Sequence, residues 1–171
     1  MAAGLNVQLW QVVQAFIDTL QTLPSFVYLI PAVMLFRVGD FTAMIAVVLY
    51  ALAPAIRYTA LGIREIDPRL IEASRAMGTT ATQRLTKVRV PLAIPEIVLG
   101  INQTVMLAIS MLVITALVGT RDLGQEVYIA LTKADVGRGI VAGLGIAMLA
   151  MIADRMMTAS AARMRRRRGL A

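Results

Sequence analysis

The chain has 171 residues, of which 58% are hydrophobic and 16% are charged; its net charge is +7 and its mean hydropathy is +0.75. Soluble domains are typically about half apolar and about a quarter charged, so this composition excludes an ordinary soluble protein and favours about four or five membrane spans of ~20 residues each. The chain contains no cysteine and no histidine, which excludes disulfides, thiol catalysis, Ser-His-Asp triads and the usual zinc ligands.

Two clusters hold most of the basic residues. Seven of the 17 Lys and Arg residues lie within residues 57–89, and six lie within residues 155–168. These clusters alternate with hydrophobic runs, which is typical of a multi-spanning protein whose Arg-rich loops face the cytoplasm. We therefore expect the 57–89 segment and the C-terminus to be cytoplasmic.

The first two hydrophobic segments are short. Residues 5–20 predict a helix that is interfacial or packed within a bundle, and that is too polar for a lipid-facing span. Residues 23–38 are apolar but contain Pro24 and Pro31, so we expect a kinked helix that runs outward and either packs in the bundle or lines a pathway. The apolar stripe of the first segment consists of Leu9, Val12, Val13, Phe16, Ile17 and Leu20.

Two longer segments predict clear membrane spans. Residues 41–63 contain Pro54, and Arg57 lies in their last third. Because an Arg at mid-bilayer costs roughly 2.5–3.5 kcal/mol, we expect Arg57 near the cytoplasmic surface, with its side chain reaching the head groups. Residues 92–120 form the second span, in which Asn102 and Gln103 need polar partners. They join neighbouring helices or border a solute pathway, and the sequence leaves both interpretations open.

The C-terminal part predicts one surface helix and one further span. Residues 122–135 are amphipathic and too short to span, so we expect them at the outer surface. Residues 136–154 form the last span, in which Gly139, Gly143 and Gly145 would allow close helix approach.

The chain ends in an Arg-rich tail, with five Arg among residues 163–168. Such a run binds nucleic acid or anionic lipid in some proteins, but directly after a span it is more simply a signal that keeps the end inside. We therefore expect one transmembrane domain over residues 1–160 and a cytoplasmic tail over residues 161–171, with no nucleic-acid partner. The predicted fold class is an all-α polytopic bundle of about four to five membrane helices.

The segment between the two long spans, residues 66–91, carries local signals for structure. Asp67 is a good N-cap and Pro68 suits the first helical position. Gly78 is placed to end that helix, and Thr80 to Gln83 has capping-box spacing. The sequence thus predicts a helix, a glycine turn and a second helix before Pro91. A short connection would join two spans, so a structured loop indicates a docking surface for a soluble partner.

This loop resembles the EAA loop of binding-protein-dependent ABC importer permeases. The spacing is Glu72-Ala73-Ser74, three residues, Gly78, nine residues, Val88, one residue and Val90-Pro91; Ser74 stands where the family has its second Ala. Further stretches resemble the glycine betaine, proline and choline branch of these permeases, although residues 119–124 share only their ends with the branch pattern. These stretches are residues 19–32, 53–68, 100–111 and 123–131.

The resemblance implies a permease subunit that is not itself an enzyme, binds no cofactor and works in the bacterial inner membrane. Its expected partners are an ATP-binding-cassette ATPase, a soluble solute-binding protein, membrane lipid and a second copy of the chain. The residues expected to couple the permease to the ATPase are Asp67, Leu70, Glu72, Ala73, Ser74, Met77, Gly78 and Pro91. The residues expected along the translocation path are Tyr28, Asn102, Gln103 and Ser110.

Two alternatives to an osmoprotectant permease stay open. The loop motif is shared by permeases for methionine, sulfonate or nitrate, so it does not identify the solute. Family members also carry a further span upstream of the region that resembles residue 19, whereas eighteen residues precede it here. We therefore expect a fragment, a mis-started reading frame, a subunit completed by another chain, or a non-transporting accessory subunit.

Overall fold

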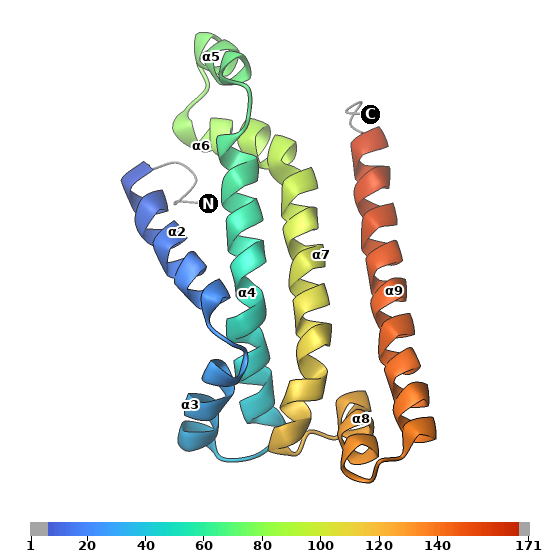
Figure 1. Cartoon of the computed structure of the whole chain (residues 1–171). Helices are drawn as coiled ribbons and strands as arrows, with labels where there is room; N and C mark the ends of the chain where they lie inside the picture. The colour runs from blue at the N-terminus through green and yellow to red at the C-terminus, as the bar shows by residue number, and fades with distance from the viewer. Residues whose placement is uncertain (1–6, 168–171) are drawn as a thin grey trace.

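The computed structural model describes the backbone of residues 7–167 and the side chains of residues 10–163. In this part of the chain every regular element is helical, and the long helices lie side by side in an elongated bundle (Figure 1). Three helical stretches are long and apolar enough to cross a membrane, namely 40–64, 81–118 and 136–163. The prediction of an all-α bundle is confirmed, with three spans, or four if the bent N-terminal pair forms one.

The N-terminal pair consists of α2 (Val7–Thr22) and α3 (Phe26–Phe36), which meet at an angle of 91°. The break lies at Pro24, whose missing N–H cannot continue a helix. The 11 residues of α3 reach ~16 Å, about half of a ~30 Å hydrocarbon core. The expected kink of residues 23–38 is thus found at Pro24, ahead of a helix over 26–36, and its outward direction stays a prediction. Pro31 lies inside α3 without breaking it.

A small apolar core holds α3 against the long helices. Tyr28 donates a hydrogen bond from its hydroxyl to the carbonyl oxygen of Leu20, which bridges the break between α2 and α3. Its ring also meets the ring of Tyr50 edge-on, with the centroids 5.8 Å apart. The buried members of this core are Tyr28, Leu29, Ala32, Ala43, Ala46, Met111 and Val118.

Helix α2 packs on α4 (Asp40–Arg64) through a narrower stripe than the sequence suggests. Trp10 and Ile17 are buried, whereas Val12 and Phe16 of the predicted stripe are exposed. Arg57 of α4 pairs with the carboxylate of Asp18 on α2, and both side chains stay partly exposed. Its position near the head groups stays a prediction. Arg64 lies over the ring of Trp10, 5.5 Å from the centroid, which adds a cation–π contact.

Helices α4 and α7 (Val90–Thr115) approach each other at two glycines. A Cβ atom at Gly100 would lie 2.8 Å from Cβ of Tyr58 and 3.2 Å from the carbonyl oxygen of Pro54. A Cβ atom at Gly62 would lie 2.7 Å from Cβ of Glu96. Because ordinary carbon contacts are about 3.5–4.0 Å, only a residue without a side chain fits at these two crossings.

The second predicted short helix does not end before the span. Helix α6 (Ala81–Arg84) passes into a π-helical turn, η1 (Leu85–Arg89), and then directly into α7. Pro91 was expected at the start of a span, and it lies in the first turn of α7, which η1 joins without a break. A π-helical turn is a wider coil that is frequently found at functional sites, and here it leads from the loop to the span without a break.

The connection after α7 contains a 3₁₀ turn, η2 (Ala116–Val118), and the short helix α8 (Leu123–Thr132). Asp122 caps α8, because its carboxylate accepts a hydrogen bond from the backbone N–H of Gln125. Asp is among the residues preferred at this N-cap position. Arg138, near the start of the next helix, pairs with Glu126 of α8 at 2.6 Å. Helix α8 is therefore a short helix between two long ones, as the sequence predicted, and its position at the outer surface stays a prediction.

The last helix, α9 (Val136–Arg167), is longer than predicted. It was expected to end at residue 154, but it continues through the predicted domain boundary at 160/161 without interruption. Gly139 and Gly145 lie near Ala130 and Leu123 of α8, whereas a Cβ atom at Gly143 would meet no atom within 4 Å. Only two of the three glycines thus face another helix. Residues 168–171 of the predicted tail lie outside the described residues.

Candidate functional site

A helical knob, residues 67–84, projects from one end of the bundle beyond α4 and α7 (Figure 1). Its first helix, α5 (Pro68–Ala76), begins where the Asp67 carboxylate accepts a hydrogen bond from the Arg69 amide at 2.8 Å. Its second helix, α6, begins with a complete capping box between Thr80 and Gln83. Both helix starts were predicted from the sequence, and the structure confirms them.

The turn between α5 and α6 depends on Gly78. Its φ of +75° lies in the left-handed region that residues with a side chain rarely adopt. A Cβ atom there would meet nothing within 4 Å, so the requirement for glycine comes from backbone conformation and not from packing. The Gly78 amide donates to the carbonyl oxygen of Arg75 at 2.9 Å, which closes the end of α5.

Ser74 faces the interior of the knob. It is buried together with Ile71, and its hydroxyl donates to the Ile71 carbonyl oxygen at 2.7 Å. The Ser74 carbonyl oxygen in turn accepts from the hydroxyl and the amide of Thr79, at 2.7 and 3.3 Å. Ser74 was expected on the docking face, and this placement corrects that expectation: it fastens the turn to α5.

The face of α5 next to Ser74 carries an exposed apolar stripe. Leu70, Ala73 and Met77 follow one another at helical spacing, and all three are exposed; the exposed fractions of Leu70 and Met77 are 48% and 83%. Glu72 is exposed beside this stripe. Apolar side chains gathered outside the bundle at a structured loop mark an interaction surface. We call Leu70, Ala73 and Met77 the knob stripe. Pro91 belongs to α7 and not to α5, although Leu70 and Leu92, the residue after Pro91, line one pocket.

The predicted pathway residues do not come together within one chain. Tyr28 is buried in the core around α3, and Asn102 is buried between α7 and α9. Gln103 is exposed. Ser110 is also exposed, and its hydroxyl donates to the Met106 carbonyl oxygen of its own helix at 2.9 Å. A pathway role for these four residues stays a prediction.

Asn102 makes the hydrogen bond that links α7 to α9. Its Nδ2 donates to Oδ1 of Asp154 at 2.8 Å, which favours the interpretation of Asn102 as a helix–helix contact. A pocket of about 230 Å³ lies alongside, and Pro95 of α7 and Met157 of α9 are among its lining residues. Sequence reasoning placed Asp154 at a helix end and missed this pair. The missed signal was an acidic residue following a long apolar run, which requires a polar partner.

Within residues 10–163, no three Asp or Glu side chains gather in an arrangement that would hold a metal ion. The features that remain for function are therefore the knob, the polar pair and the apolar flanks of the spans.

Comparison with known proteins gives a consistent result. Residues 1–166 match the family described as binding-protein-dependent transport system inner membrane component. The chain is 43% identical over 164 residues to the glycine betaine transport system permease protein OpuAB of Bacillus subtilis, covering 91% of this chain and 58% of that protein. It is 42% identical to the glycine betaine/proline betaine transport system permease protein ProW of Escherichia coli, covering 91% of this chain and 46% of ProW.

A third relative, the glycine betaine/carnitine transport permease protein GbuB of Listeria monocytogenes, is 45% identical over 143 residues, covering 84% of this chain and 51% of GbuB. The chain thus spans about half the length of the curated relatives it matches. The fold is also similar to that of a chain in inward-facing structures of the MetNI methionine ABC transporter. That match has a TM-score of 0.82 and 22% identity, and covers 93% of this chain and 77% of the other.

Proposed function

Since the chain belongs to the family of binding-protein-dependent transport system inner membrane components, we propose that it is the permease subunit of an ATP-binding-cassette importer for glycine betaine and related osmoprotectants. The observation that carries the proposal is the exposed knob stripe on a loop with the family's Glu72, Ala73 and Gly78. The chain forms membrane-spanning helices and leaves ATP hydrolysis to a partner.

The knob is the surface on which the ATPase docks. Leu70, Ala73 and Met77 are presented to solvent by a helix whose buried face is already satisfied inside the knob. Apolar side chains of this kind fill a groove on a partner. The exposed Glu72 carboxylate would fix how α5 is positioned along that groove, by pairing with a positive charge on the ATPase. Gly78 acts indirectly, by holding α5 at its angle to α6.

The proposed placement is the bacterial cytoplasmic membrane, with the knob and the C-terminus inside. The knob and the C-terminal end of α9 lie at the same end of the bundle, and α3 and α8 lie at the other (Figure 1). Basic residues gather at the end that carries the knob, in agreement with the positive-inside rule. Two copies of the chain, related by a twofold axis, would enclose the pathway, and a soluble receptor would deliver the solute from outside.

Glycine betaine or a related compound is the proposed solute because the three relatives reported above carry it in their names. The likeness to the methionine transporter, at 22% identity, concerns the fold alone. A permease should hold its solute weakly, and a chain with only 5% aromatic residues offers few aromatic faces for a quaternary ammonium group. Tight capture is therefore assigned to the soluble receptor.

The test is reconstitution of the full chain with its ATPase and receptor in vesicles. We expect ATP-dependent uptake of radiolabelled glycine betaine, and no uptake of methionine, sulfonate or nitrate. Uptake of methionine alone would overturn the proposed solute. Failure of the ATPase to co-purify with the chain would overturn the permease assignment in favour of an accessory subunit.

A further inference from the structure

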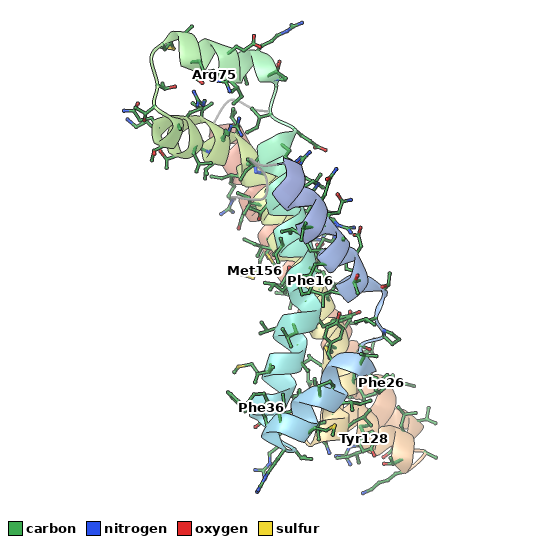
Figure 2. The ribbon with its side chains drawn as sticks, turned by 90° about the vertical axis from the view of Figure 1, so that its left-hand side faces the viewer. Phe16, Phe26, Phe36, Arg75, Tyr128 and Met156 are labelled. Atoms are coloured by element: carbon green, nitrogen blue, oxygen red, sulfur yellow. The ribbon has the colours of Figure 1, made fainter. Side chains whose placement is uncertain are left out.

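Three arginines from separate elements meet between the knob and the bundle. Arg75 comes from α5, Arg84 from α6 and Arg89 from η1. Figure 2 shows Arg75 on the side of α5 that faces α6. Arg84 and Arg75 both lie close enough to Arg89 to act on it by like-charge repulsion. We call Arg75, Arg84 and Arg89 the arginine cluster.

The described part of the chain supplies no carboxylate to this cluster. Its two ion pairs are Arg57 with Asp18 and Arg138 with Glu126, and both lie elsewhere. Arg84 and Arg89 are half-buried, so water compensates their charges only in part. Like charges held together without a counter-charge are unfavourable, and a bound anion would remove this cost.

A pocket of about 250 Å³ adjoins the cluster. It is lined by Ala81, Thr82, Arg84, Leu85 and Arg89. A water molecule occupies about 30 Å³ of liquid, so the pocket has room for a tetrahedral anion with part of its hydration shell. Arg presents a planar fork of N–H donors that matches phosphate oxygens in pairs, and Thr82 adds a hydroxyl group to the same wall.

The pocket lies at the level expected for lipid head groups. Helix α7 has 26 residues, which correspond to ~39 Å and exceed the ~30 Å hydrocarbon core. The preceding segment, residues 81–89, therefore lies at or beyond the polar boundary. Arg84 and Arg89 line this pocket, and none of the knob-stripe residues does.

We propose that Arg84 and Arg89 bind a phosphate group in this pocket of the α6–η1 segment, and that Arg75 of α5 adds positive charge from the facing side. The phosphate comes either from an anionic lipid head group or from free phosphate. This site is separate from the solute pathway and from the knob stripe.

The experiment measures binding to the purified full chain. In one arm the chain is placed in nanodiscs of phosphatidylcholine with increasing phosphatidylglycerol, and bound lipid is counted by native mass spectrometry after release. In the other arm, inorganic pyrophosphate is titrated into detergent-solubilised chain. We expect Arg84→Gln/Arg89→Gln to weaken binding at least about tenfold, which corresponds to ~1.4 kcal/mol. The matched control is Arg69→Gln, an exposed arginine of α5 outside the cluster.

The arms distinguish the sources of phosphate, and both sources support the proposal. Retention of phosphatidylglycerol without pyrophosphate binding identifies the lipid, whereas pyrophosphate binding in detergent identifies the free ion. Arg75→Gln changes an exposed residue, so its effect is measured on a folded chain, and Arg89→Lys should keep part of the affinity.

Equal affinity in the double variant and the parent chain would overturn the proposal, as would an equal loss in the Arg69→Gln control. Loss of ATPase co-purification in the double variant with unchanged phosphate affinity would also overturn it, and would assign the cluster to an acidic protein surface. Because neither arm uses solute or ATP, the result does not depend on whether the chain transports osmoprotectants.

Discussion

Asn102 of α7 and Asp154 of α9 are 52 residues apart in the sequence, and their side chains are joined by a hydrogen bond of 2.8 Å. Helix α9 has few other polar links to the bundle among the described residues, since its remaining side-chain bond to another element runs from Arg138 to Glu126. The pair therefore sets how α9 is placed along α7.

Replacing Asn102 with Leu should destabilise the chain by about 1 kcal/mol, because hydrogen bonds between membrane helices are worth roughly that amount. Asp154→Asn should cost less, since Asn102 Nδ2 keeps an oxygen acceptor. The measurement is thermal unfolding in detergent, followed by circular dichroism. Gln103→Leu is the matched control, because Gln103 is exposed on the same helix; an equal loss in this control would contradict the role given to the pair.

Gly100→Ala should destabilise the crossing of α4 and α7 by about 1–3 kcal/mol, the usual cost of forcing extra atoms into a packed interface. The added methyl group would lie 2.8 Å from Cβ of Tyr58. Gly143→Ala places the same group in open space and should leave stability unchanged or slightly higher, because Ala favours helix. Denaturation with increasing sodium dodecyl sulfate compares the two variants, and a similar loss in both would contradict this interpretation of α4–α7 packing.

Gly78→Ala should lower the stability of the knob by roughly 1–2 kcal/mol, since a residue with a side chain must enter the left-handed region. Gly78→Asn should cost less, because Asn tolerates that region better. Hydrogen exchange of the α5 amides reports the local opening. If Ala and Asn gave the same exchange rates as Gly, the backbone conformation would not be what requires glycine at this position.

Leu70→Asp and Met77→Asp should abolish co-purification of the ATPase and leave the unfolding temperature of the chain unchanged, because both side chains are exposed. Ile71→Asp should instead destabilise the knob itself, since Ile71 is buried and an unpaired charge in the interior is costly. Pull-down with the ATPase, alongside thermal unfolding of the chain, separates the two effects. Normal ATPase binding by both exposed variants would rule out the knob stripe as the docking face.

Reversing the charge of Arg57 with Arg57→Asp should loosen α2 from α4, because it places two carboxylates together. The double variant Arg57→Asp/Asp18→Arg should restore most of the loss. Since both partners are partly exposed, the effect should shrink at high salt, where such pairs are screened. Protease protection of α2 at low and high salt measures it; a double variant no better protected than the single would show that the pair does not hold α2.

The knob was predictable because its signals are local. The Asp67 cap, the Thr80–Gln83 capping box and the Gly78 turn each involve residues a few positions apart, so the spacing contains the information. Arg57 and Asp18 are 39 positions apart, and no local pattern connects them. The same holds for Asn102 and Asp154, whose pairing depends on how α7 and α9 pack.

The errors in helix ends have a different cause. Asp154 and Arg155 end the apolar run, so hydropathy placed the end of the last span there, yet the residues that follow are mostly Ala, Met and Arg, which favour helix. Pro91 correctly suggested the start of α7, but nothing in the sequence showed that the π-helical turn η1 would join it to α6. Hydropathy locates the membrane, whereas the helix itself continues as far as backbone propensity allows.

The two connections between the knob and the bundle differ in secondary structure. On one side α4 ends at Arg64, and residues 65–67 lead to α5 without helical structure. On the other side, the backbone is helical without a break from Ala81 to Val118. The knob is therefore joined to the bundle by one flexible connection and one rigid helix. A displacement of α6 is thus passed along the continuous helix to the far end of α7, whereas residues 65–67 can bend.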